Sequence, residues 1–222
     1  MKKTILFLTT IFTLLTFTPA MLHAQEDGAQ TQENEARALL DQVAAKLKNA
    51  GGLQAQFTAT SYTGRDEAGN SSGTLSVKGR KFKLVSPAIQ QWFDGTTLWA
   101  LEAGSNEIYV NKPTRSELQQ INPYSFLDLY KQGYVLSVND DMEDGKNIKD
   151  IHLISKSTKN PIQEMFVSIG QDLMPFSVRV RMGKKNWLKI RINSLKTGIR
   201  FPDSDFVLNT ERFPNYEIID LR

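Results

Sequence analysis

Apolar and polar residues follow a helical spacing in one early segment of the chain and alternate one by one in most of the rest. Five apolar residues recur at intervals close to the helical repeat: Ala36, Leu39, Leu40, Val43 and Leu47. The glycine pair at 51–52 predicts the end of this helix, because glycine commonly terminates helices. The polar segment 25–32 ahead of it has no such pattern, and we expect it to be loose.

Alternation with a period of two predicts strands through most of the chain after residue 52. The predicted strands are 53–60, 75–77, 82–84, 90–93, 96–102, 107–111, 134–138, 148–155, 164–169, 176–182 and 187–194, with 206–208 and 216–219 as weaker candidates. Short turns between them indicate an antiparallel meander, because parallel neighbours need long crossovers. Roughly ten strands in one sheet must curl or close. The predicted fold class is therefore mainly β, within α+β.

The middle of the chain departs from this alternation. Residues 114–131 carry clustered apolar side chains on both sides of Asn122 and Pro123. Proline interrupts helices and restricts the residue before it, so this segment predicts two short helices broken at Pro123. Helices are thus expected only at the start and in the middle of the chain.

The first residues are typical of an export signal. Lys2 and Lys3 precede an uncharged apolar run at 5–17, and Ala24 offers a small residue before a cut at Gln25. The run is shorter than the ~20 residues that span a bilayer as a helix, which disfavours a membrane anchor. We expect a cleaved signal peptide at 1–24, a single domain at 25–222 and an exported protein.

Composition removes most catalytic chemistry. The chain has no Cys and only two His, at positions 23 and 152, so disulfides, thiol nucleophiles and clustered His sites are excluded. Motif searches find neither a phosphate-binding glycine loop nor a nucleophile elbow. The acidic residues at 140–144 lie in a predicted turn, where a solvated turn is favoured over a metal or glycosidase site. We expect no enzymatic activity, no metal and no cofactor.

A basic strip follows the predicted strands between residues 176 and 200. It carries Arg179, Arg181, Lys189 and Arg191, and no acidic residue lies within it. Apolar residues alternate with these cations, which predicts one apolar and one cationic face. The cationic face is either a solvated outer surface or a docking surface for an acidic partner or an anionic membrane. Loss of Lys2 and Lys3 lowers the formal net charge from +3 to +1, so nucleic acid is not an expected partner.

Apolar residues on the alternating positions of 53–110 allow two interpretations. They form a closed, packed core, or a curled sheet with few helices leaves an apolar cavity, as in small lipid-binding barrels. The pattern alone does not separate these two.

From the first predicted helix onward, the chain resembles the periplasmic outer-membrane lipoprotein carrier family, LolA. The resemblance rests on LQAQF at 53–57, GTLSVK at 73–78 with Phe82 after it, DGTTLW at 94–99, NP at 122–123, FVSIG at 166–170 and FSV at 176–178. It implies an unclosed antiparallel β-barrel whose hollow side is covered by helices. It also implies a hydrophobic cavity that takes the acyl chains of a lipoprotein released from the inner membrane.

The resemblance also implies roles for individual residues. The expected acyl-chain-binding residues are Phe57, Leu75, Val77, Phe82, Leu84, Leu98 and Phe176. For Phe82, an ordinary core position is the competing interpretation. The family continues its GTLSVK-like strand with Arg-Pro, whereas here Gly79 and Arg80 follow and the proline is missing. Arg80 is the expected substitute for the family arginine that latches the lid. The four strip cations named above are the expected docking residues.

Three functions are weighed from these observations. The first is a carrier of acylated lipoproteins, receiving cargo from an inner-membrane lipoprotein-releasing ABC transporter, delivering it to an outer-membrane acceptor, and acting as a monomer. The second is a lipid- or lipoprotein-sensing periplasmic regulator on the same fold. The third is a hydrolase on a β scaffold, for which the sequence offers no nucleophile–base pair.

Overall fold

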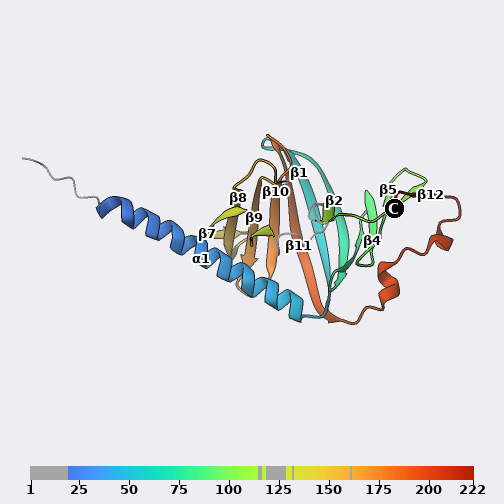
Figure 1. Ribbon diagram of the computed structural model, residues 1–222, viewed down its shortest axis with the longest axis horizontal. Coiled ribbons are helices and arrows are strands. Elements are labelled where there is room, and N and C mark those ends of the chain that lie inside the picture. The colour runs from blue at the N-terminus through green and yellow to red at the C-terminus, as the bar shows by residue number, and fades with distance from the viewer. Residues whose placement is uncertain (1–19, 115–116, 119–128, 132, 161) are drawn as a thin grey trace, which may run out of the picture.

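The computed structural model describes residues 20–222 apart from 115–116, 119–128, 132 and 161, and the side chains from residue 28 onward. One long helix, α1 (Ala20–Asn49), lies beside a single strongly curled sheet (Figure 1). Most of the segment predicted to form two central helices lies outside the described residues. Among the described residues, no helix combines the length and hydropathy needed to cross a bilayer.

Helix α1 forms because one of its faces is continuously apolar. Ala36, Leu40 and Val43 are fully buried against the sheet, and Leu47 is nearly so. The chain turns away at Gly51, whose φ of +73° suits glycine. The expectation that 25–32 is loose was wrong: this segment is helical, because extending an existing helix costs far less than starting one.

Twelve strands of the described part of the chain form one sheet. They are β1 (Gly52–Thr63), β2 (Asp66–Lys78), β3 (Lys81–Val85), β4 (Ile89–Phe93), β5 (Leu98–Glu102), β6 (Glu107–Asn111), β7 (Tyr134–Glu143), β8 (Lys146–Ser155), β9 (Glu164–Gly170), β10 (Pro175–Arg181), β11 (Asn186–Ile199) and β12 (Glu217–Asp220). Their order is β12-β6-β5-β4-β3-β2-β1-β11-β10-β9-β8-β7. The prediction of an unclosed, mainly β sheet is confirmed.

Two meanders, β1–β6 and β7–β11, are joined by the long antiparallel pairing of β1 with β11. The expected sheet was a simple antiparallel meander. The observed sheet differs because β1 pairs with β11 and because β12 pairs in parallel with β6. The weaker strand candidate 206–208 was wrong. It begins at the last residue of the short 3-10 helix η1 (Asp203–Phe206), and burial rather than strand pairing explains its apolar Phe206 and Leu208.

Each face of the sheet has its own core. On the inner face, apolar residues of α1 belong to one core with residues of β1–β5 and β7–β10, including Tyr134 and Ile151. On the outer face of β4–β6, the C-terminal segment, with η1 and η2 (Thr210–Arg212), contributes Leu208, Phe213 and Tyr216 to a second cluster around Trp92. The C-terminal segment therefore packs on the outer face and contributes none of the described side chains of the inner-face core.

Candidate functional site

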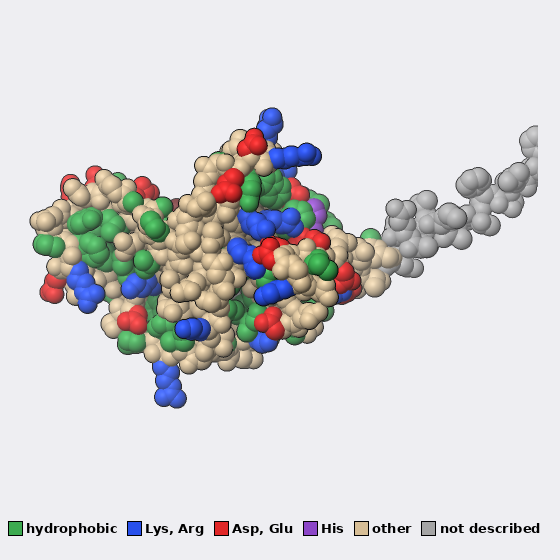
Figure 2. All heavy atoms as spheres, turned by 180° about the vertical axis from the view of Figure 1, so that it is seen from behind, with side chains coloured by type: hydrophobic (Ala, Val, Ile, Leu, Met, Phe, Trp, Pro, Cys, Tyr) green, Lys and Arg blue, Asp and Glu red, His purple; other side chains and the backbone are tan. Residues whose placement is uncertain are grey.

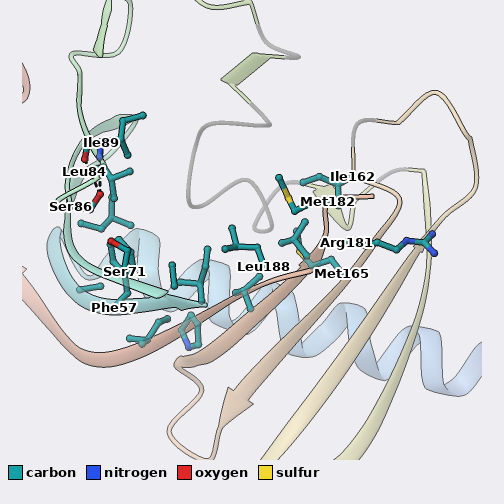
Figure 3. A pocket seen from close by; sticks show the side chains of 18 of the residues that line it. Phe57, Ser71, Leu84, Ser86, Ile89, Ile162, Met165, Arg181, Met182 and Leu188 are labelled. Carbon is teal, nitrogen blue, oxygen red and sulfur yellow. Dashed lines mark hydrogen bonds between the residues drawn. The ribbon is translucent and has the colours of Figure 1, made fainter. Parts of the chain in front are cut away.

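A cavity of about 940 Å³ opens on the inner face of the curled sheet. In Figure 3, Leu84, Ser86 and Ile89 border it on one side, and Ile162, Met165 and Leu188 border it on the other. The end of α1 contributes Leu47. The remaining lining comes from β1, β2, β10, β11, the turn between β10 and β11, the β3–β4 turn and the loop before β9: Leu53, Ala55, Phe57, Ala59, Ser71, Leu75, Ala88, Gln163, Pro175, Val178, Val180, Arg181, Met182, Gly183, Lys184, Ile190, Ile192 and Leu195.

Small inward residues explain why the cavity is hollow. Ala59 on β1 pairs with Ser71 on β2 and with Ile190 on β11, so one row across the floor holds two small side chains. A sheet that curls around such a row leaves space that side chains of this size do not fill. The surrounding positions are aliphatic, so the space is suited to an apolar ligand.

The cavity floor also contains a close contact between Phe57 and Gly73. The two residues are register partners on β1 and β2. A Cβ atom at Gly73 would lie 2.6 Å from Cζ of Phe57 and 2.7 Å from the carbonyl oxygen of Val85. Only glycine therefore lets the Phe57 ring lie against the sheet, where the ring forms part of the lining.

The structure divides the expected acyl-chain residues of strands β1–β5 into two groups. Phe57, Leu75 and Leu84 line the cavity, whereas Val77, Phe82 and Leu98 do not. The expectation for this second group is corrected. Val77 pairs with Phe82, Phe82 with Phe93 and Phe93 with Leu98, so four bulky residues form one continuous row.

Within that row the rings of Phe82 and Phe93 lie 5.4 Å apart, and Phe82 is only 1% exposed. Alternation correctly placed these residues on the inner face. Whether they lie in the cavity or in the packed core beside it depends on the register between neighbouring strands.

Phe176 was also expected in the cavity, and this is corrected. A register shift between Pro175 and Ser177 interrupts the alternation of β10. Pro175 and Val178 line the cavity, while the ring of Phe176 lies on the outer face. There the guanidinium carbon of Arg191 is 3.3 Å and Nζ of Lys146 5.5 Å from its centroid. The bulge therefore turns Phe176 from an acyl-chain contact into a partner for cations.

Arg80, the expected lid latch, lies exposed in the turn between β2 and β3. Among the described residues it forms no ion pair or side-chain hydrogen bond, and most of the central segment expected to cover the sheet lies outside the described residues, so the latch assignment stays a prediction. The lysines that flank the turn bind the C-terminal segment instead: Lys78 and Lys81 each lie 2.8 Å from the carboxylate of Asp203. Hydrogen bonds from Lys78 and Lys81 lower the pKa of Asp203 to about 2.

The four expected docking cations occupy alternate positions of β10 and β11, and Arg181 also borders the cavity, but each is paired with a carboxylate. The pairs are Arg179–Asp150 at 2.5 Å, Arg181–Glu164 at 3.2 Å, Lys189–Glu143 at 2.7 Å and Arg191–Asp144 at 2.9 Å. The acids come from β7–β9 and the turn after β7, so they are remote in sequence. The expected cationic face therefore carries acidic partners from other strands, and docking through its four cations stays a prediction.

The structure adds lining residues that the sequence interpretation did not assign to the site. Most come from β9–β11, among them Met165, Val178, Leu188, Ile190 and Ile192. Their alternation was visible between residues 176 and 192, but it indicated only an apolar face. The pairing of β11 with β1 places that face beside Phe57 and Ala59.

Comparison with known proteins supplies a family match. Residues 27–184 match the family model described as outer membrane lipoprotein carrier protein LolA. No curated protein matches the chain.

Several solved structures resemble the chain at low sequence identity. A DUF1329 family protein from Desulfovibrio piger gives a TM-score of 0.44 at 10% identity, covering 78% of this chain and 97% of its own. The LolA superfamily protein NE2245 from Nitrosomonas europaea gives 0.42 at 10% identity, covering 78% and 98%. The MucA/MucB complex of Pseudomonas aeruginosa gives 0.42 at 11% identity, covering 80% of this chain and 62% of the matched chain.

Proposed function

Because the chain belongs to the LolA family of outer membrane lipoprotein carrier proteins, we propose that it carries acylated lipoproteins through the periplasm. The observation that carries the proposal is the cavity of about 940 Å³, lined mainly by aliphatic side chains of a curled sheet. The export signal expected at 1–24 supports the location. In this proposal, cargo comes from an inner-membrane ABC transporter and passes to an outer-membrane acceptor.

The work of such a carrier is burial without catalysis, and the proposal assigns the protein no enzymatic activity. Each acyl CH₂ group removed from water contributes about 0.8 kcal/mol, so a lipid anchor needs an apolar cover to cross an aqueous space. Phe57, Leu75 and Leu84 offer such contacts on one wall, and Val178, Leu188 and Ile190 on the other. Release to the acceptor requires only that the acceptor bind the acyl chains more favourably.

A binding experiment with matched cargo tests this function. The exported protein is mixed with a triacylated lipoprotein or with the same polypeptide lacking its acyl chains, and complexes are measured by pull-down and size exclusion. We expect a 1:1 complex with the acylated form alone. Equal recovery of the non-acylated form would contradict acyl burial as the basis of recognition.

Two further measurements distinguish the carrier from other uses of the cavity. Mass spectrometry of lipids extracted from the purified protein identifies what the cavity holds after export. Depletion of the protein in cells is expected to leave lipoproteins in the inner membrane. An altered stress response with normally placed lipoproteins would instead indicate a sensing regulator.

A further inference from the structure

Two loops that border the cavity carry lysines and no carboxylate. The loop after β8, residues 156–163, contains Lys156 and Lys159, and the turn after β10, residues 182–185, contains Lys184 and Lys185. Ile162 and Gln163 of the first loop and Met182, Gly183 and Lys184 of the second line the cavity. We call the four lysines the lysine rim.

The pairing of β9 with β10 brings the two loops that carry the lysine rim to the mouth of the cavity. Met165 on β9 pairs with Val180 on β10, which brings the ends of the two loops together, and Figure 3 shows Ile162 beside Met182. The Tyr134 hydroxyl donates a 2.8 Å hydrogen bond to the carbonyl oxygen of Ile162 and holds the first loop in place. Burial raises the pKa of this phenol, so it stays protonated as a donor.

The charges of the lysine rim are unneutralised. All four lysines are exposed, and among the described residues none forms an ion pair. Arg181, by contrast, is paired with Glu164 and points away from the cavity in Figure 3.

The neighbouring β1–β2 turn lies against the second loop, because the Gly64 amide donates a 2.8 Å hydrogen bond to the carbonyl oxygen of Lys185. It adds Arg65 and the carboxylates of Asp66 and Glu67, so the two loops and this turn together carry five cations and two carboxylates. Basic side chains project from this end of the molecule in Figure 2, with acidic ones beside them.

An exposed apolar residue accompanies these charges. Met182 is 65% exposed although it adjoins the cavity lining. A flexible apolar side chain among lysines is the combination by which peripheral proteins contact lipid headgroups, since the cations attract anionic lipid and the apolar group enters the interface. A surface that binds an acidic protein would not require an exposed methionine at the cavity mouth.

We propose that the lysine rim and Met182 dock the cavity mouth on an anionic phospholipid bilayer. The proposal rests on the carrier function in one respect: docking would bring the cavity opening to the membrane that holds the acyl chains. Docking is expected to be reversible and sensitive to salt, because exposed charges are screened beyond a Debye length of about 8 Å at physiological ionic strength.

The test is co-sedimentation of the exported protein with vesicles of phosphatidylcholine alone or with about one third phosphatidylglycerol. The test variant is Lys156→Gln/Lys159→Gln/Lys185→Gln, which leaves the cavity-lining Lys184 in place. The matched control is Lys48→Gln/Lys112→Gln/Lys196→Gln, three exposed lysines away from the mouth. Fluorescent fatty-acid binding to each protein reports separately on the cavity.

We expect wild type and control to bind the anionic vesicles, and the test variant to bind them roughly tenfold more weakly, with fatty-acid binding unchanged in all three. Wild-type binding that is no stronger to anionic than to neutral vesicles would overturn the proposal, as would equal binding by test variant and control. Absent fatty-acid binding with retained, lysine-dependent docking would overturn the carrier function and leave the docking surface standing.

Discussion

Nη1 of Arg37 on α1 donates a hydrogen bond of 2.5 Å to the carbonyl oxygen of Tyr130. Nη2 of the same guanidinium reaches the carbonyl oxygen of Tyr134 at 3.1 Å and pairs with Glu33 at 2.6 Å. The Tyr130 hydroxyl donates in turn to Asp41, one helical turn further along. The helix is therefore tied to the chain that enters β7 by directional polar contacts as well as by its apolar face.

The first prediction concerns this tie. Arg37→Met keeps much of the side-chain volume but removes the donors to both carbonyl oxygens, and we expect it to lower the free energy of unfolding by about 2 kcal/mol. Urea denaturation followed by circular dichroism measures the change. Lys48→Met, an exposed lysine on the same helix, is the control and is expected to change stability by less than about 0.5 kcal/mol. Equal losses in the two variants would contradict the assigned role of Arg37.

A second prediction separates the core from the cavity with two phenylalanines. Phe82→Ala removes a ring from the packed row and is expected to cost about 3–5 kcal/mol. Phe57→Ala removes a half-buried ring that faces open space, so we expect a smaller stability loss but roughly tenfold weaker fatty-acid binding. Thermal melting and a fluorescent fatty-acid titration measure both properties. A Phe82→Ala protein that stayed stable and lost fatty-acid binding would restore Phe82 to the cavity wall.

The third prediction concerns the outer-face ion pair of Arg179 and Asp150. Asp150 is only 8% exposed and also accepts a 2.7 Å hydrogen bond from Ser168. Arg179→Met would leave the Asp150 carboxylate buried without a cation. We expect the free energy of unfolding to fall by about 2 kcal/mol, less than for a fully buried pair because Arg179 is partly exposed.

The double variant Arg179→Met/Asp150→Asn is expected to lose less stability than the sum of the two single variants, because no uncompensated charge remains. A urea-unfolding cycle over the four proteins measures this coupling. Additive losses would mean that the pair contributes nothing beyond its separate side chains.

The fourth prediction is a pH dependence of the C-terminal segment. The pKa of Asp203 is about 2, below the usual 3.8, because Lys78 and Lys81 stabilise its charged form. The stabilisation by these ion pairs is therefore fully present above about pH 4 and is lost as the pH falls through about 2. Hydrogen exchange of peptides covering 203–208, compared at equal pH, should show less protection in Asp203→Asn than in wild type at pH 6. The difference should shrink towards pH 2. A constant difference across this range would show that the ion pairs are not its cause.

Much of the fold could be predicted because alternation depends on local sequence. Eleven strand segments after residue 52 were recognisable from apolar spacing, and the first helix from Ala36 to Leu47, since a side chain's face follows from its position in a strand or helix. The parallel pairing of β12 was not predictable, because it depends on where the chain goes after β11.

The candidate site was predictable only in part, for the same reason. Phe57, Leu75 and Leu84 were correctly placed on a shared apolar face that lines the cavity. Alternation along the strand places Phe82 on the same apolar face. Only its pairing with Phe93 shows that it lies in a row already filled by bulky side chains. For Phe176, alternation predicted the wrong face, because the bulge at 175–177 shifts the strand by one residue.

The sequence by itself determined most of the strands, the apolar and cationic faces and the family, because these depend on neighbouring residues and on motifs that stay within single segments. Only the tertiary structure decided which charges remain free. Arg179, Arg181, Lys189 and Arg191 are neutralised by acids from other strands, whereas the lysine rim is not. It also decided where the sheet is hollow, because cavity volume depends on side chains that different strands bring to the same level.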